Sequence, residues 1–302
     1  MALSERGYAR DNKPWRAPGA PWSALPVNTL LIIVNVVIFV VQAFLPKFAV
    51  LGLGQFDVLG WWGHFSTVTL FKLEVWRLVS FQFLHAGVLH LFMNMMGLYF
   101  FGAMVEQYLG KKKYLAFYLV CGICGGLAYL LLNLAGIIAA KMGLTGIPGL
   151  LYGSAATPLV GASAGVFGVI LACAFIAPNA VVQLLIPPIP LKMKFFAYGY
   201  VAIAFISVFL GAKNAGGEAA HLGGAIAGFF FIRNSHLLRD FFDIFDDSRK
   251  KPDAPAAGPP PGQTDAEVDR ILDKVRDKGL HALSDKERAT LERASQRKRN
   301  GA

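Results

Sequence analysis

The sequence predicts an all-α, polytopic membrane protein: a bundle of six transmembrane helices followed by a small cytoplasmic helical hairpin. Of the 302 residues, 55% are hydrophobic, above the roughly 45–50% that is usual in soluble domains. The apolar residues gather in long runs between Pro26 and Ile232, and the chain beyond them is strongly polar. Basic residues cluster at the chain ends and in alternate loops, as they do where loop charge sets membrane topology.

The apolar runs are long enough for membrane spans. A transmembrane helix needs about 20 mainly apolar residues, and six segments reach or approach this length. They are 27–45, 88–108, 114–136, 159–177, 194–210 and 217–232. The second and sixth segments contain polar residues, and the last two are short. Such segments are typical of helices that line a cavity or pack inside a bundle.

The loop charges predict the orientation of these spans. With six spans, most basic residues lie on one side: Arg6, Arg10, Lys13, Arg16, Lys111, Lys112, Lys113, Lys192, Lys194, Arg233 and the basic tail. The other side receives only Lys47, Lys72, Arg77, Lys141 and Lys213. Basic loops remain in the cytoplasm, so both termini are expected there. The formal charge of +10 therefore indicates topology, and we expect no nucleic-acid partner because no nucleic-acid motif accompanies it.

The outer loop over 46–87 is long and rich in aromatic residues, among them Trp61, Trp62 and Trp76. Tryptophan prefers the headgroup zone of a bilayer. The loop is therefore expected either to lie partly in the outer leaflet or to act as a plain interfacial anchor.

The second span begins with three polar residues. His90 and Asn94 are four residues apart and so share a helix face, and His85 lies just before them. Polar groups within a membrane are expensive and usually functional, although a single histidine often only bonds a neighbouring helix. Three polar groups on one side favour a functional site.

The fourth and sixth spans carry a serine and a histidine among glycines. Ser163 lies within a GxSxG pattern whose Gly161 and Gly165 would also form a close-packing face. His221 shares a stripe with Gly224 and Gly228. Without a preceding strand, GxSxG is weak support for a hydrolase. Glycine faces on both helices would nevertheless bring serine and histidine within the hydrogen-bonding distance that a base-activated nucleophile requires.

The depths of these residues support one shared layer. If the fourth span starts near Pro158, Ser163 lies roughly 7.5 Å along the helix, at 1.5 Å per residue. If the sixth starts near Gly217, His221 lies at about 6 Å. His90 and Asn94 enter from the same side. Four polar groups from three helices would therefore meet close to the outer surface.

Glu106 lies at the opposite end of the second span. It could serve as a proton relay. A structural role, in which its carboxylate accepts hydrogen bonds from loop or helix-end amides, is favoured.

These motifs resemble the rhomboid proteases. The resemblance rests on His85, His90 and Asn94 at their spacings, on the Gly161–Gly165 segment, on the Ala220–Gly224 segment, and on Trp76 with Arg77; it covers about residues 27–232. It implies a six-helix rhomboid bundle, an intramembrane serine endopeptidase and a Ser163–His221 dyad without an aspartate. It further implies an oxyanion hole made by His90, Asn94 and the Ser163 amide, with His85, Gly161, Gly165 and Gly224 in supporting roles. Transmembrane proteins would be the substrates.

The resemblance to bacterial rhomboids also predicts a multi-pass protein of the bacterial inner membrane, in contact with the lipid bilayer. The predicted domains are an N-terminal segment over 1–26, the protease domain over 27–232, a charged and Pro-rich linker over 233–263 and a helical tail over 264–302. In the tail, apolar residues at helical spacing are followed by Ser284 and Glu287, which resemble a capping box.

Two other functions fit parts of the pattern. A metal-dependent hydrolase would use His85, His90 and His221, but the sequence has no HExxH motif and no acidic residue is expected beside them. A non-catalytic relative would bind membrane proteins without cutting them, and would not need both Ser163 and His221. We therefore expect a protease that uses no metal and no cofactor.

Overall fold

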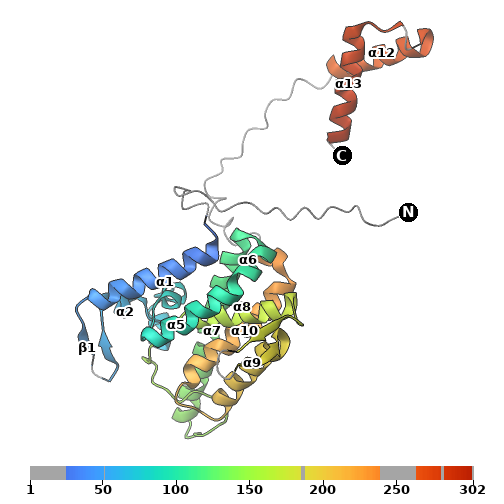
Figure 1. Cartoon of the computed structure of the whole chain (residues 1–302). Coiled ribbons are helices and arrows are strands. Elements are labelled where there is room, and N and C mark those ends of the chain that lie inside the picture. Colours follow the sequence, from blue (N-terminus) through green and yellow to red (C-terminus); the bar gives the residue numbers. More distant parts are fainter. Residues whose placement is uncertain (1–24, 51, 185–187, 239–262, 280–281, 301–302) are drawn as a thin grey trace. The chain divides into compact units, whose positions relative to one another are not determined.

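The computed structural model describes residues 25–50, 52–184, 188–238, 263–279 and 282–300. The chain divides into two compact units, Met1–Asp243 and Ile244–Ala302. Six long helical segments dominate the described part of the first unit, and a helical hairpin forms that of the second (Figure 1). The predicted fold class is confirmed.

Each predicted span corresponds to a helical segment. The segments are α1 (Val27–Phe44), the rod of α5 (Val88–Gly97), η3 (Leu98–Gly102) and α6 (Ala103–Leu109), α7 (Lys111–Lys141), α8 (Ser163–Ile176), α9 (Met193–Phe209) and α10 (Ala215–Arg233). Within the described residues, α1, the Val88–Leu109 rod and α7 are long and apolar enough to cross a membrane, and α8 and α9 are shorter apolar helices. The η3 turn has π-helical geometry, a feature often found near functional sites.

Helix α8 lies at the centre of the bundle, where it packs against α7 and α10. Nearly all of its side chains are buried. On α10, Gly224 faces the backbone of Ala164 and Gly228 faces Gly168, so these two helices touch along their backbones. The glycine stripe of the sixth span therefore allows the close approach that its spacing predicts.

The expected glycine face of the fourth span is wrong in one respect. Gly161 lies before the first residue of α8, so it shares no helix face with Gly165. A Cβ at Gly161 would meet the His90 ring of α5, and a Cβ at Gly165 would meet the Tyr118 ring of α7. The two glycines therefore make room for two different helices.

Glu106 holds the start of α1. Its Oε1 accepts a hydrogen bond from the Val27 amide and its Oε2 accepts one from the Asn28 amide, both at 2.8 Å. The first amides of a helix have no intrahelical acceptor, and a carboxylate there also favours the helix dipole. The predicted structural role of Glu106 is confirmed.

The loop over 46–87, which is predicted to lie on the outer side and is called the outer loop below, contains short elements joined by buried polar side chains. They are β1 (Phe48–Val50), β2 (Gly54–Phe56), α2 (Val58–Gly63), α3 (Thr67–Phe71), α4 (Arg77–Ser80) and η2 (Phe81–Phe83). Arg77 is 3% exposed and donates from Nη1 to the carbonyls of Trp61 (2.7 Å) and His64 (2.8 Å). Its Nε lies 2.7 Å from Glu74 Oε2. Arg77 therefore stabilises the loop.

Two antiparallel hairpins were not predicted. One pairs β1 with β2, and the other pairs β3 (Val181–Gln183) with β4 (Pro190–Lys192) between α8 and α9. Each strand has three residues, so the hairpins lie within loops and leave the helical bundle unchanged. Strands this short give almost no periodic signal in a sequence.

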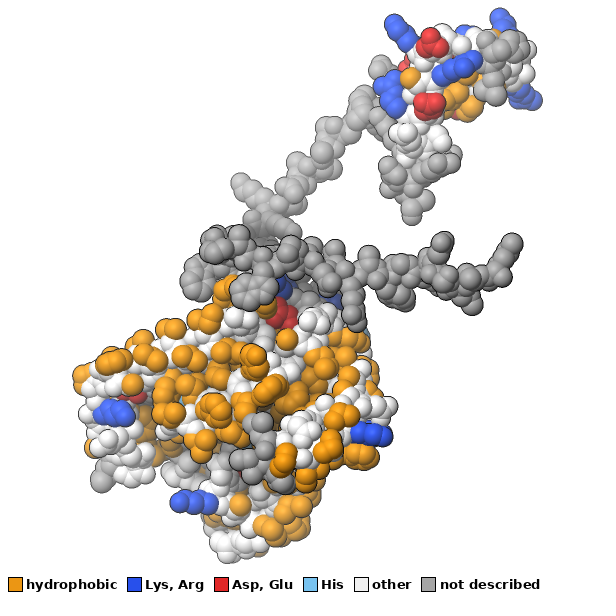
Figure 2. Space-filling view, in the orientation of Figure 1, with side chains coloured by type: hydrophobic (Ala, Val, Ile, Leu, Met, Phe, Trp, Pro, Cys, Tyr) orange, Lys and Arg blue, Asp and Glu red, His pale blue; other side chains and the backbone are white. Residues whose placement is uncertain are grey.

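The outer surface of the bundle is apolar. Figure 2 shows one face covered by hydrophobic side chains, with Lys and Arg side chains toward its rim instead of across its middle. Large exposed side chains on α1 and α9 include Val37, Phe44, Ile203 and Phe205. A surface of this kind suits hydrocarbon and not water.

The second unit consists of α12 (Gln263–Lys278) and α13 (Asp285–Asn300). The predicted capping box is confirmed: Ser284 N donates to Glu287 Oε2 at 2.8 Å, and Glu287 N donates to Ser284 Oγ at 3.4 Å. Lys274 pairs with Glu287 across the hairpin at 2.9 Å. Ile271 and Leu283 are buried.

The predicted linker over 233–263 lies mainly outside the described residues, as does the N-terminal segment over 1–26. The described beginning of the linker is structured: after α10 ends at Arg233, Ser235–Leu238 form the 3-10 turn η4. Leu238 is 2% exposed and belongs to the core of the bundle. The packed domain therefore extends six residues beyond its predicted end at 232.

Candidate active site

Ser163 is positioned by the segment that precedes α8. This segment is extended: Leu159 and Phe65 of the outer loop exchange backbone hydrogen bonds of 3.1 and 2.7 Å, and Gly161 N donates to Phe81 O at 2.9 Å. Gly161 has φ +133°, a conformation open to glycine but strained for other residues. The depth expected for Ser163 assumed a helix that starts near Pro158. This assumption was wrong, because Ser163 is the first residue of α8.

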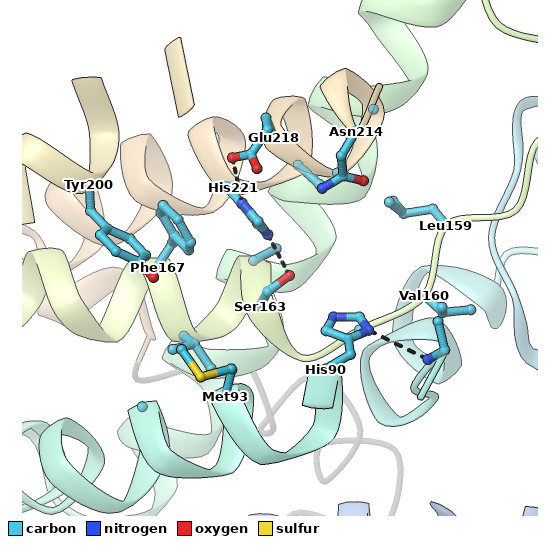
Figure 3. Close-up of a pocket in the computed structure, with 18 of the residues that line it drawn as sticks. His90, Met93, Leu159, Val160, Ser163, Phe167, Tyr200, Asn214, Glu218 and His221 are labelled. Atoms are coloured by element: carbon cyan, nitrogen blue, oxygen red, sulfur yellow. Dashed lines mark hydrogen bonds and ion pairs between the residues drawn. The ribbon is translucent and has the colours of Figure 1, made fainter. Parts of the chain in front are cut away.

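The Ser163 hydroxyl contacts the His221 imidazole. Ser163 Oγ lies 2.7 Å from His221 Nε2, which joins the start of α8 to the second turn of α10. Phe167 stacks on the imidazole, with ring centroids 4.2 Å apart and an interplanar angle of 12°. Figure 3 shows the imidazole between Ser163 and Glu218, with Phe167 and Tyr200 beside it. The ring is therefore held both by a hydrogen bond and by stacking.

Glu218 was missed by the sequence analysis, which expected no acidic residue beside these histidines. Its Oε2 lies 2.9 Å from His221 Nδ1. The two residues are three apart on α10, a spacing that puts side chains next to each other on a helix. That spacing is the signal that could have found Glu218. The sequence analysis placed Glu218 near the start of the sixth span and gave it no role.

His90 lies on the other side of Ser163. A Cβ at Gly161 would come within 2.7 Å of His90 Cε1 and 3.6 Å of Ser163 Oγ, so both side chains crowd the same glycine. His90 Nδ1 accepts a hydrogen bond from the Ala86 amide at 3.4 Å. The structure therefore brings together Ser163, His221 and His90, as their shared layer predicts.

Asn94 and His85 are close to this group but turned away from it. Asn94 Nδ2 donates to His90 O at 2.9 Å, one turn back on α5, and its side chain does not line the cavity that contains Ser163. The His85 ring meets the His90 ring edge-on at 5.1 Å. Both His85 nitrogens are buried without a hydrogen-bond partner among the described residues. Burial, and after it the neighbouring His90, lowers the pKa of His85 to about 3.

Ser163, His221 and His90 line a cavity of about 750 Å³. Its apolar walls come from α5 and η3 on one side and α9 on the other, and include Met93, Met96, Phe100, Phe196, Tyr200 and Ile203. Glu218, Lys213 and Asn214 lie at its polar end. A volume of this size accommodates a small ligand or several residues of an extended peptide.

Within the part of the chain that the structure describes, no group of three or more His, Cys, Asp or Glu side chains is arranged to hold a metal ion. The geometry instead pairs a hydroxyl with an imidazole.

Curated relatives match limited parts of the chain. RHOMBOID-like protein 1 of Arabidopsis thaliana is 39% identical over 84 residues, and RHOMBOID-like protein 7 of the same plant is 40% identical over 79 residues. These matches cover 28% and 26% of this chain, and 22% and 25% of the relatives. Rhomboid protease GlpG of Yersinia pestis is 31% identical over 104 residues, which cover 32% of this chain and 36% of GlpG. The chain thus spans about a third or less of these relatives' lengths.

Two family models match separate regions. Residues 262–297, in the second unit, match a family of unknown function (DUF6576). Residues 72–234, from the outer loop to the end of α10, match the model described as Rhomboid domain. That match covers more than half of the chain and contains every residue of the candidate site. The chain is therefore a multi-pass membrane protein that belongs to the rhomboid family.

Proposed function

We propose that this protein is an intramembrane serine endopeptidase that cuts transmembrane proteins in or near the membrane. The observation that carries the proposal is the 2.7 Å contact between Ser163 Oγ and His221 Nε2. A serine hydroxyl is a weak nucleophile until a positioned base takes its proton, and a neutral imidazole is the usual base. Ser163 of α8 and His221 of α10 lie within the hydrogen-bonding distance that this proton transfer requires.

In the proposed reaction, His221 Nε2 takes the proton from Ser163 Oγ as that oxygen bonds to the carbonyl carbon of the scissile peptide. The carbonyl electron pair moves to oxygen. When it returns, the C–N bond breaks and the leaving amine takes the proton from His221. Water then attacks the resulting acyl-enzyme ester, with the same imidazole first accepting and then returning a proton, and Ser163 is released.

The developing oxyanion has donors near Ser163. Because Ser163 is the first residue of α8, its N–H has no acceptor within the helix and points to the end where negative charge is favoured. His90 lies beside Gly161 and can add a second donor. Asn94 is proposed as a third, which requires its amide to leave the His90 carbonyl when substrate binds.

The cavity walls support a membrane-embedded substrate. An apolar opening between α5 and α9 would accept a segment that arrives sideways from the bilayer, and we propose the short helix α9 as the gate. An intact helix hides its carbonyls in hydrogen bonds. Substrates with helix-breaking or small residues near the cut would therefore be preferred.

The test is cleavage of a model transmembrane substrate by purified protein in micelles or vesicles. Ser163→Ala and His221→Ala should each abolish product while leaving insertion and thermal unfolding unchanged, because each removes one half of the nucleophile–base pair. A fluorophosphonate probe should label the wild-type protein but not Ser163→Ala. Cleavage by Ser163→Ala at the wild-type site would refute the proposal, and binding without cleavage by the wild type would indicate a non-catalytic membrane protein.

A further inference from the structure

The cavity contains a carboxylate, that of Glu218, which has no role in the reaction proposed for Ser163 and His221. Glu218 Oε2 lies 2.9 Å from His221 Nδ1, and the other nitrogen of the same ring lies 2.7 Å from Ser163 Oγ. We propose that Glu218 is a positioning residue that selects the reactive form of His221. Ser163 and His221 would then be the catalytic residues and Glu218 the residue that positions His221, and this inference rests on the proposed function.

The geometry holds Glu218 and His221 in register. Both lie on α10, one turn apart on the same face. Gly224 on the next turn packs against the Ala164 backbone, which fixes α10 against α8, and Phe167 covers one face of the imidazole. The ring can therefore turn little without losing either its stacking or a hydrogen bond.

The chemistry depends on the tautomer of His221. To accept the Ser163 proton, Nε2 must carry a lone pair, so the ring proton must be on Nδ1. A carboxylate only accepts hydrogen bonds and therefore favours Nδ1–H. It also stabilises the imidazolium that forms when Ser163 attacks. Among the described residues, Glu218 is the only hydrogen-bond partner that the structure gives to Nδ1.

A nearby cation increases the importance of this carboxylate. Lys213, before α10, lines the same cavity and carries a positive charge. That charge opposes the positive charge that His221 acquires during the reaction. Glu218 supplies a compensating negative charge 2.9 Å from His221 Nδ1.

The first measurement is steady-state cleavage by Glu218→Gln and Glu218→Asp. Gln keeps the size of the side chain but loses its charge, so we expect kcat to fall about 10–10²-fold with KM changed less than twofold. Loss of a buried triad carboxylate costs about 10⁴-fold elsewhere. The Glu218 side chain is 22% exposed, so water can take over part of its role. Asp should restore part of the lost kcat because it keeps the charge.

The second measurement needs no activity. In protein labelled with ¹⁵N-histidine and held in micelles, the nitrogen shifts of His221, identified by their absence in His221→Ala, should indicate the Nδ1–H tautomer. Glu218→Gln should reduce that population. Glu74→Gln is the matched control, because Glu74 also forms an ion pair and is 19% exposed, but it belongs to the outer loop. It should leave the His221 signal unchanged.

The outcomes separate the two proposals. Unchanged kcat in Glu218→Gln, or an Nδ1–H population of His221 that this substitution leaves unchanged, would overturn the role of Glu218 while leaving the Ser163–His221 pair intact. Cleavage by Ser163→Ala would overturn the protease assignment, and the tautomer measurement would still decide whether Glu218 orients the ring. A fall in kcat with Asp rescue and loss of the Nδ1–H signal would support the inference.

Discussion

Gly161 illustrates how closely the candidate site depends on single residues. Its positive φ turns the chain into α8, and its missing side chain leaves space for both His90 and Ser163. Any other residue there would be strained and would displace the His90 ring. The glycine before Ser163 therefore serves positioning, whereas Gly165 and Gly224 serve helix packing.

Asn94 gives a prediction at this scale. Asn94→Ala should lower kcat by about 10–10³-fold with KM nearly unchanged, because a donor to the oxyanion acts in the transition state and not on bound substrate. Steady-state kinetics with the model substrate measures both constants. Its ground-state bond to His90 O means that the amide must reorient first. A change in KM alone would make Asn94 a packing or substrate-binding residue.

His85 predicts a pH dependence of stability. Burial lowers its folded-state pKa to about 3 from the model-peptide value of about 6.5, so the unfolded chain takes up the proton first as pH falls. The stability contributed by neutral His85 is complete above pH ~6.5 and is lost progressively below it. At pH 5 the loss should be about 2 kcal/mol.

Thermal unfolding in micelles at pH 7 and pH 5 measures this effect. His85→Gln, which cannot take up a proton, should show a smaller drop than the wild type. Burial also lowers the pKa of His64, so some pH dependence should persist in the variant. Equal drops in both proteins would show that His85 does not contribute.

At the scale of elements, the contact between α8 and α10 sets the distance between serine and histidine. A Cβ at Gly224 would strike the Ala164 carbonyl and lie 3.0 Å from its Cα. Backbone atoms cannot move aside as side chains do. Gly224→Ala should therefore push the helices apart, lower stability by about 1–3 kcal/mol and reduce kcat by about 10²-fold.

Gly199 of α9 is the matched control, because a Cβ there would meet no atom within 4 Å. Gly199→Ala makes the same chemical change in a neighbouring helix and should leave thermal unfolding in micelles unchanged or slightly raised. Equal losses in both variants would mean that glycine content, and not the α8–α10 contact, is limiting.

The outer loop is an element held by buried polar bonds. Arg77 joins it internally through the Trp61 and His64 carbonyls, and the Phe65–Leu159 pairing joins it to the segment before Ser163. The exposed rings of Trp62 and Trp76 suit a headgroup region. The position of this loop therefore helps to fix the position of the segment that precedes α8.

At the scale of the whole molecule, helix directions predict topology. The starts of α8 and α10 meet at Ser163 and His221, whereas the start of α1 meets the end of the α5–α6 rod at Glu106. These are opposite ends of the bundle. With the basic loops in the cytoplasm, Ser163 should open to the outer face and both termini should be cytoplasmic.

Cysteine labelling in intact cells tests this orientation. Met142, just after α7, is 70% exposed, and Lys112 at the start of α7 is also exposed. With Cys121, Cys124 and Cys173 replaced, an impermeant thiol reagent should label Met142→Cys from outside. Lys112→Cys should react only after permeabilisation. Labelling of Lys112→Cys in intact cells would invert the orientation and move the proposed cut to the cytoplasmic face.

The sequence by itself determined the number of helical segments, the grouping of Ser163, His221 and His90, and the role of Glu106. Hydropathy and helical period are local properties, so they can be read without knowing which segments touch. The spacing of Gly224 and Gly228 likewise indicated a close helix contact before its partner was known. Family motifs then distinguished a serine–histidine pair from other uses of the same residues.

Only the tertiary structure decided how these residues meet. It placed Ser163 at the first turn of α8, used Gly161 to make room for His90 and brought the His221 ring of α10 to the Ser163 hydroxyl. Each outcome depends on which backbones pack side by side and on where a helix begins. Those are set by contacts between residues far apart in the chain, which no local pattern records.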